Sequence, residues 1–457
     1  MNPAGRTDYR LWPLLVVGLG TLVVPLDSAV NVDFPHIVRR FDLPLPAIQW
    51  IVISYVLTQT SLLLSFGRIG DMLGYRRVFL FGTGWSSLAF VACALAPSYP
   101  VLLLGRVAQG IGAGLILSCG PALATSLFPE AMRPRILGLY TMMFGIGGAL
   151  GPLVFGLLVE RFGWSAVFSF RAPLAALAFL LAWRLPAARS TAKAEKFDAA
   201  GGVFLAVALS FGLLALNQIR DLSDHPGSFS LCVISSLAGF ILFLHQERSC
   251  PRPIIDLRYF ASSGFTAINL AHALINLAAF SIMLLAPFYL SRIAGLSVPM
   301  AGLVLAVSPL GITLASPIAG WLAANQPART IALAGTLLSG LGLLGISFTG
   351  MQPSLMWLGA SMLVQGFGVG LFQVAYFDMI TATIPREDRG VAGALGMATR
   401  TIGTVTGATL LFLVFQTLRD SAGTAGDAAF LAAFQGTFRV AAAIPLALLA
   451  VALLRRQ

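Results

Sequence analysis

Seven ionisable residues stand inside long apolar stretches of this chain, where little water is at hand to solvate a charge. They are Asp27, Asp33, Arg106, Arg171, His272, Asp378 and Arg400. Such residues are costly in a bilayer and usually face a cavity, a partner or an ion pathway. Burial favours the neutral form of a carboxyl group, whereas a nearby arginine favours its charged form. An acid beside an arginine could therefore take up and release protons, as proton-coupled exchange requires.

Asp27 and Asp33 are the candidate proton carriers, and Arg106 is the candidate for the charge that modulates them. If this stretch is α-helical, Asp27 and Asn31 are one turn apart and share a face. The alternative interpretation is structural. Arg106 would then bond backbone carbonyls, and the two aspartates would cap helix ends near water.

The elements that hold these residues follow from composition. Hydrophobic residues make up 57% of the 457, and charged residues only 10%, against about 25% in soluble domains. This excludes a soluble enzyme, a nucleic-acid binder and a disordered protein, and it predicts an all-α polytopic membrane protein. Stretches long enough to span a bilayer recur about fourteen times. They lie near 11–33, 46–66, 77–96, 99–127, 135–158, 164–184, 199–217, 228–245, 264–291, 299–324, 329–348, 354–380, 391–417 and 428–454.

Basic residues outnumber acidic ones, giving a formal net charge of +11. Most of them fall in alternate loops, and loops rich in arginine and lysine stay on the cytoplasmic side. This pattern places the N-terminus in the cytoplasm, and an even number of helices returns the C-terminus to the same side. We therefore expect a multi-pass protein of the plasma membrane, with the lipid bilayer as a partner, no nucleic acid and a monomeric state.

Neither the cysteines nor the histidines are spaced as metal ligands. The four cysteines form no CxxC pair and the four histidines are scattered, so no metal or organic cofactor is expected. No Ser/His/Asp set or phosphate-binding loop is evident in the sequence. These observations argue against an enzyme. A membrane receptor or a membrane-embedded enzyme is the alternative to a transporter.

The chain contains an internal repeat. The motif QGxGxGL occurs at 109–115 and again, 256 residues later, at 365–371. The same offset pairs Arg133 with Arg389. Matched loops on one membrane side indicate two parallel halves around a central substrate site. The predicted domains are an N-terminal six-helix bundle over 1–184, a linker with two extra transmembrane helices over 185–263, and a C-terminal six-helix bundle over 264–457.

Several short motifs carry a family resemblance. Residues 67–77 read GRIGDMLGYRR, residues 106–112 read RVAQGIG, and residues 147–156 read GGALGPLVFG. Together they resemble the major facilitator superfamily, specifically its fourteen-helix drug:proton antiporter branch. The first is similar to that family's GxLaDrxGrr loop, and the third to the gxxxGPxxGG motif typical of exporters. The matching positions are Gly67, Asp71, Gly74, Arg76 and Arg77 in the loop, and Gly147, Gly151, Pro152 and Gly156 in the fifth helix.

The resemblance implies that Asp71 belongs to a loop clamp that holds one conformation. The alternatives are a simple cap for the next helix and ordinary anchoring by the neighbouring arginines. In the second half Ala324 stands opposite Asp71, so a loop clamp would be asymmetric. The glycines of the fifth helix allow close backbone approach, and tight packing alone would also explain them.

Polar and aromatic residues on the predicted helices could line a pocket for a lipophilic compound. The candidates are Asn31, Trp50, Tyr55, Gln109, Arg171, Phe372, Gln373, Tyr376, Asp378 and Arg400. Ordinary packing or lipid contact is the alternative for such a set. His272 is more typical of a hydrogen-bonded core histidine, and Asp378, near the end of its helix, of a structural role.

The resemblance implies a proton-driven exporter of a small amphipathic compound or drug, which works by alternating access of two six-helix halves. Protons and a small-molecule substrate are then its partners, and the proton gradient is its energy source. A metabolite importer or facilitator of the same fold is the alternative within transport. The GxxxGP pattern of the fifth helix favours export.

Overall fold

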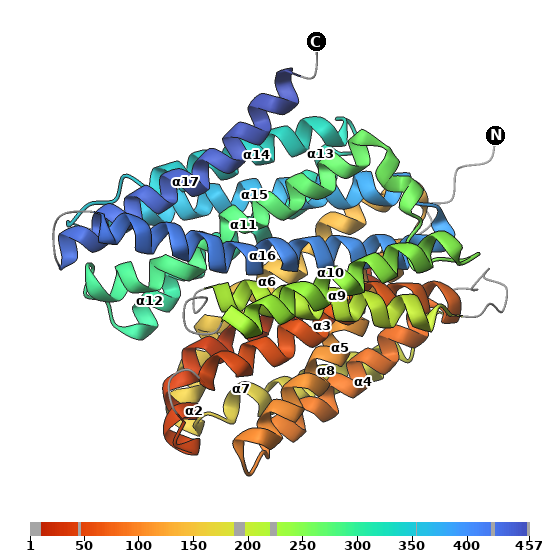
Figure 1. The fold of residues 1–457 in the computed structure, drawn as a ribbon, viewed down its shortest axis with the longest axis horizontal. Coiled ribbons are helices and arrows are strands. Elements are labelled where there is room, and N and C mark those ends of the chain that lie inside the picture. Colours follow the sequence, from red (N-terminus) through yellow and green to blue (C-terminus); the bar gives the residue numbers. More distant parts are fainter. Residues whose placement is uncertain are drawn as a thin grey trace, which may run out of the picture.

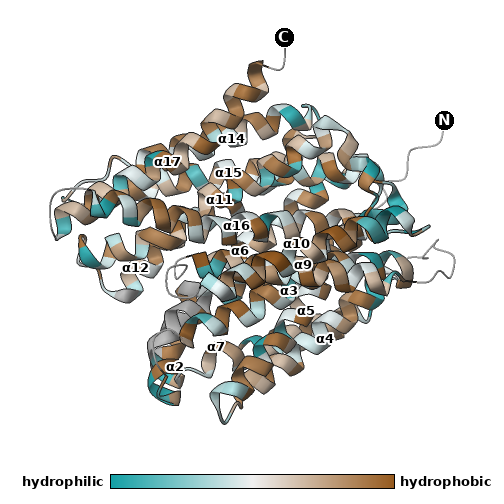
Figure 2. Ribbon diagram, viewed as in Figure 1, coloured by the Kyte–Doolittle hydropathy of each residue, from teal (hydrophilic) through white to brown (hydrophobic). Residues whose placement is uncertain are grey.

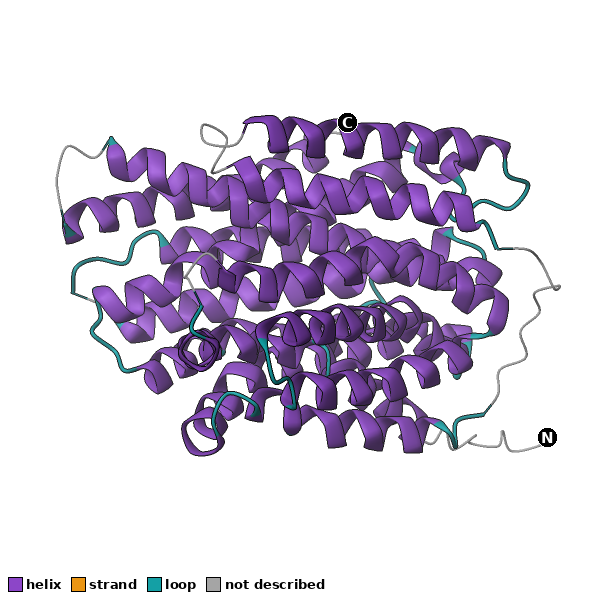
Figure 3. Ribbon diagram, turned by 60° about the horizontal axis from the view of Figure 1, so that its bottom comes forward, coloured by secondary structure: helices purple, strands orange, loops and turns teal. Residues whose placement is uncertain are grey.

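The computed structural model describes residues 11–43, 47–186, 197–219, 226–352, 354–421 and 426–454, with the backbone alone at 29, 31–35, 152, 155–157, 160 and 298. Within these ranges all regular structure is helical and no strand occurs (Figure 3). Eleven of the described helices are long and apolar enough to cross a membrane. Two shorter apolar stretches cover Trp12–Ser28 and Ala166–Ala182. The predicted all-α polytopic fold is confirmed.

The helices follow the predicted apolar stretches in order. The first part of the chain forms α1 (Trp12–Leu22), η1 (Pro25–Asp33), α2 (Phe34–Phe41), α3 (Ile48–Leu73), α4 (Tyr75–Ala94), α5 (Tyr99–Ser126), η3 (Glu130–Met132), α6 (Arg133–Phe162), α7 (Ala166–Ser169) and α8 (Arg171–Ala182). The middle part forms α9 (Ala199–Gln218), α10 (Pro226–Ser249) and η5 (Leu257–Ala261). The last part forms α11 (Ser263–Arg292), α12 (Val298–Leu305), α13 (Val307–Leu322), α14 (Ala328–Ile346), α15 (Leu355–Thr383), η6 (Arg386–Asp388), α16 (Arg389–Asp420) and α17 (Asp427–Leu454).

The predicted stretches 11–33, 164–184 and 299–324 are each interrupted in the structure, although α12 and α13 together still form one apolar span, Pro299–Leu322, long enough to cross a membrane. Every break lies beside a proline. Proline has no N–H for the bond to the carbonyl four residues earlier, and its ring crowds that carbonyl. Pro173 and Pro309 withhold this bond from the residues that end α7 and α12. Pro25 follows the end of α1 and opens the 3-10 segment η1.

The internal repeat appears in the packing of the two glycine-rich helices. A side chain at Gly110 of α5 would collide with the Tyr55 carbonyl of α3, 2.7 Å from its ideal Cβ position. A side chain at Gly366 of α15 would collide with the Ser308 carbonyl of α13 in the same way. Equivalent glycines thus let equivalent helices approach in both halves, as parallel repeats require.

The two halves lie side by side, and the pair α9 and α10 runs along the seam between them (Figure 1). This pair touches both halves: Ser210 of α9 shares a 2.8 Å hydrogen bond with Ser61 of α3, and Thr409 of α16 donates to the Leu216 carbonyl at 3.2 Å. Hydrophobic residues line the length of the bundle, and polar residues gather towards its ends (Figure 2).

Candidate functional site

Asp27 lies at the centre of a charged cluster in the first half. Arg106 of α5 donates to both of its carboxylate oxygens, at 2.7 and 2.8 Å. Arg171, the first residue of α8, donates to Oδ1 at 2.8 Å, and Gln109 donates to the same oxygen at 2.7 Å. The side chain of Asp27 keeps 14% of its surface exposed, whereas both arginine side chains are fully buried. One carboxylate therefore neutralises one of two buried guanidinium groups.

Both arginines also contact other groups of the protein, although Nε of Arg171 is buried without a hydrogen-bond partner. Arg106 Nε donates to the Ile51 carbonyl at 2.8 Å, and its guanidinium lies 4.5 Å from the ring centroid of Tyr55. Arg171 donates to the Val23 carbonyl at 3.0 Å and lies over the ring of Phe90. Both the predicted pairing of Arg106 with Asp27 and the alternative, bonding to a backbone carbonyl, are present together.

The break in the first helix positions Asp27. The N–H of Asp27 donates to the Val24 carbonyl at 3.0 Å, the short bond of a 3-10 turn. The α-helical spacing that placed Asp27 and Asn31 on one face therefore does not apply, and that expectation is wrong. The side chains of Asn31 and Asp33 lie outside the described residues.

The exporter-like motif of α6 packs against the junction where α1 ends and η1 begins. A side chain at Gly147 would meet the Leu22 carbonyl and the Pro25 ring, each 2.6 Å from its ideal Cβ position. Glycine at this position therefore lets α6 press directly against the junction of α1 and η1. Gly151 is buried on the same helix, and the side chain of Pro152 and the surroundings of Gly156 are not described.

Asp71 joins the two halves at the end of the bundle that carries the α3–α4 turn, η3 and η6, which we call the motif end. It accepts hydrogen bonds from the N–H groups of Gly390 and Val391, at 2.7 and 3.2 Å. These are the first free N–H groups of α16, where a negative charge is favourable. Tyr75 also donates to Asp71 at 2.8 Å. Asp71 thus caps a helix, but one in the opposite half.

Glycines make this contact possible. Gly74 adopts φ +93°, which an L side chain disfavours, and so permits the sharp turn from α3 to α4. A side chain at Gly390 would lie 2.4 Å from the Gly67 carbonyl, and one at Gly67 would lie 2.6 Å from the Gly390 carbonyl. In the same turn Arg76 donates to the Trp183 carbonyl within the first half, and Arg77 is exposed.

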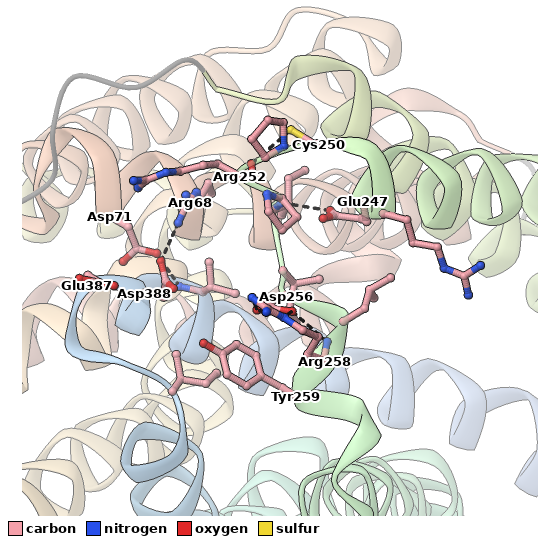
Figure 4. A pocket seen from close by; sticks show the side chains of 18 of the residues that line it. Arg68, Asp71, Glu247, Cys250, Arg252, Asp256, Arg258, Tyr259, Glu387 and Asp388 are labelled. Carbon is pink, nitrogen blue, oxygen red and sulfur yellow. Dashed lines mark hydrogen bonds and ion pairs between the residues drawn. The ribbon is translucent and has the colours of Figure 1, made fainter.

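Ion pairs reinforce the junction at the motif end. Arg68 donates to Asp388 of η6 at 2.6 Å, on the wall of a cavity of about 700 Å³ beside the α10–α11 connection (Figure 4). Glu130 of η3 accepts from Arg389 at 2.7 and 3.0 Å. Arg133 pairs with Asp378 of α15 at 3.0 Å. Each pair links the first half to the last, so the halves are fastened together at this end.

Glu130 makes this fastening dependent on pH. The hydrogen bond from Arg389, aided by the charges of Arg389 and Arg133, holds the pKa of the Glu130 carboxyl below its usual value. A depressed folded-state pKa adds stability above the unfolded pKa, about 4.3 for glutamate, and this stability disappears as the pH falls through the folded pKa. The junction is therefore complete at neutral pH and weakens only in acid.

Glu130→Gln should lower the unfolding temperature near pH 7, where it removes an ionised partner from Arg389. Once the pH has fallen through the depressed pKa of Glu130, the wild-type carboxyl is protonated too, so the two proteins should converge. Thermal unfolding in detergent across this range measures the difference, with the exposed Glu387→Gln as the matched control. A difference in unfolding temperature that stays the same at every pH would contradict the role given to the ionised Glu130 carboxylate.

Two of the remaining candidates, Phe372 and Tyr376, form a second group with His272. Tyr376 stacks on His272, with ring centroids 3.8 Å apart, and Phe372 lies next in the same stack. Arg400 lies over the ring of Phe144, a residue of α6. Gln373 is buried. Trp50 belongs to neither group and is 44% exposed in the first turn of α3.

Some residues of these sites were not identified from the sequence. Asp388 and Glu130 lie in short 3-10 turns, and only the repeat of Arg133 at Arg389 pointed to this region. Phe90 and Phe144 are two of 32 phenylalanines, and only the packing distinguishes them as residues beneath arginines.

Comparison with known proteins decides the family. A sequence profile described as Major Facilitator Superfamily matches residues 17–254 and 268–457. The chain belongs to this superfamily. Accordingly it is a multi-pass membrane transporter of small molecules and not an enzyme.

Similar members of the superfamily have different names. The Multidrug resistance protein Stp of Mycobacterium tuberculosis (strain CDC 1551 / Oshkosh) is 30% identical over 404 residues, which cover 88% of this chain and 75% of that protein. The Riboflavin transporter RibZ of Clostridioides difficile (strain 630) is 28% identical, covering 83% of each chain. A Methylenomycin A resistance protein of Streptomyces coelicolor (strain ATCC BAA-471 / A3(2) / M145) is 30% identical, covering 89% of this chain and 86% of that protein.

Solved structures of the superfamily have the same fold. The human organic anion transporter MFSD10 (TETRAN) matches with a TM-score of 0.70 at 16% identity, over 98% of this chain and 100% of that one. The proton:xylose symporter XylE bound to 6-bromo-6-deoxy-D-glucose matches with a TM-score of 0.68 at 15% identity, over 98% and 95%. At such low identity the likeness concerns this major facilitator's architecture alone.

Proposed function

We propose that this major facilitator exports a small amphipathic compound in exchange for protons. The observation that supports it is the partly exposed Asp27, held by two buried arginines and a glutamine. A proton on Asp27 removes the negative charge that these donors share. Arg106 and Arg171 then lose their ionic partner while still buried, a costly arrangement that favours repacking of α5 and α8 around η1. Protonation is thereby linked to helix movement. Asp33 is the alternative carrier.

The two halves, 1–184 and 264–457, then alternate in access, with the helix pair of 185–263 spanning their seam. The fastened motif end is the closed side of this conformation. The arginine-rich loops at that end are cytoplasmic under the positive-inside rule, so the substrate site opens outward. In this proposal the transporter is a monomer of the plasma membrane, has both termini in the cytoplasm and uses no cofactor beyond the proton gradient.

Export by the fourteen-helix drug:proton antiporter branch fits the relatives and the motifs. Resistance proteins recur among the similar chains, including a Tetracenomycin C resistance and export protein of Streptomyces glaucescens. The α6 motif also packs against η1 through Gly147, close to the proposed proton carrier. A metabolite transporter is the second candidate, because the similar RibZ is named for riboflavin.

Inside-out vesicles from cells that express the chain provide the test, with a panel of amphiphilic fluorescent compounds as probes. Respiration should drive uptake of at least one probe, and both an uncoupler and Asp27→Asn should abolish it. Full transport both with the uncoupler and by the Asp27→Asn variant would refute proton coupling through Asp27. Rapid counterflow without any proton gradient, together with no energised accumulation, would favour the facilitator.

A further inference from the structure

A buried polar cluster in the second half takes no part in the proton-carrying group. His272 of α11 is almost fully buried, and its Nδ1 lies 2.9 Å from Thr399 Oγ1. Thr399 donates its only hydrogen to helix carbonyls, that of Leu395 at 2.9 Å and that of Gly396 at 3.0 Å. A hydroxyl that donates to these carbonyls can accept a hydrogen bond from Nδ1, which leaves Nε2 as an acceptor. This Nε2 is buried and has no hydrogen-bond partner.

The neighbouring Arg400 has no counter-charge among the side chains that the structure describes. Its guanidinium lies 3.9 Å from the ring centroid of Phe144, so it reaches from α16 to the first half. Its Nη1 is buried and has no hydrogen-bond partner, and no carboxylate among the described residues forms an ion pair with it. Arg400 as a whole keeps intermediate exposure, and charged residues within membrane helices mark ligand or ion paths.

The deep carboxylates whose side chains the structure describes do not pair with Arg400. Asp27 is shared by Arg106 and Arg171, and Asp378 pairs with Arg133 at the motif end. An anionic ligand would supply the charge that Arg400 lacks.

We infer that Arg400 binds the negatively charged group of an amphiphilic substrate, a carboxylate or its equivalent. The inference rests on the proposed function, since it names the substrate class of the transporter. It excludes the cationic amphiphiles as preferred substrates. Because Arg400 of α16 packs on Phe144 of α6, a ligand bound to Arg400 would sense the relative movement of the two halves.

The test uses three aromatic scaffolds, naphthalene, indole and biphenyl, each as the carboxylate, the neutral amide and the methylammonium compound. Thermal stabilisation of the purified full-length protein reports binding. The carboxylates should bind best in every set. Arg400→Gln should weaken carboxylate binding at least about tenfold, the loss expected for a charge-assisted hydrogen bond, and leave amide binding unchanged. Arg400→Lys should retain part of the preference, and the exposed Arg439→Gln should change nothing.

Equal binding of all three charge types, or a preference for the ammonium compounds, would overturn the inference. If Arg400→Gln does not fold, the ranking of the three types by the wild-type protein still decides. Failure of the transport proposal is distinguishable from failure of this one. A protein that binds carboxylates but exports nothing would refute export alone, and a protein that exports only cations would refute the anion site alone.

Discussion

Asp27→Asn is expected to abolish transport and to destabilise the protein by about 3–5 kcal/mol, the usual cost of leaving a buried charge without its partner. The amide keeps the shape of the carboxylate but loses its charge. Arg106 and Arg171 stay buried beside it. Transport is measured in proteoliposomes, and the free energy of unfolding by chemical denaturation in detergent.

Two further variants separate the causes. Asp42→Asn is the matched control, because Asp42 is exposed and its φ of +50° suits asparagine. It should change neither measurement. Asp27→Asn combined with Arg171→Gln removes one unpaired charge, so it should regain part of the lost stability and still not transport. Wild-type transport by Asp27→Asn would show that this carboxyl group carries no coupled proton.

Asp71→Ala is expected to shift the protein towards a conformation that is open at the motif end, by at least about tenfold in the ratio of open to closed forms. The substitution removes the acceptor of the Gly390 and Val391 N–H groups. It leaves the start of α16 without its cap from the other half. Slower transport should follow, since the closed state becomes harder to reach.

Spin labels on the two halves measure this shift. Leu73 and Glu387 are exposed at the motif end on either side of the junction. Spin-labelled cysteines at these positions, in a variant without the four native cysteines, give a distribution of distances by pulsed electron paramagnetic resonance spectroscopy. Asp71→Ala should increase the share of long distances. Asp256→Asn is the control, since Asp256 pairs with Arg258 inside one segment. An unchanged distribution would show that Asp71 does not hold the halves together.

Much of the fold follows from local sequence. A bilayer requires every backbone group to be bonded within its own segment, so each long apolar stretch becomes a helix. The three interrupted helices show the limit of that argument. Pro25, Pro173 and Pro309 mark the breaks, yet Pro121 and Pro287 lie inside helices that continue past them. Neighbouring helices decide between these outcomes, and no local pattern contains them.

The candidate sites divide in the same way. Asp27 and Arg106 were predicted as partners because charges at bilayer depth need one, and the structure brings them together from positions 79 residues apart. Arg171 was placed only in a possible cavity, and its position on the same carboxylate follows from the break at Pro173, which starts α8 at that residue. The proposed roles of all three stay predictions.

The sequence by itself determined the membrane fold, the repeat and the residues whose charge is costly in lipid, because hydrophobicity and spacing act locally. Only the tertiary structure decided which charges are compensated. Asp71 binds backbone N–H groups 319 residues away, a partner without any side-chain signature. Among the described side chains Arg400 has no carboxylate partner, whereas Arg106 has one. Compensation is a property of three-dimensional neighbours, and the helices that supply them come from opposite ends of the chain.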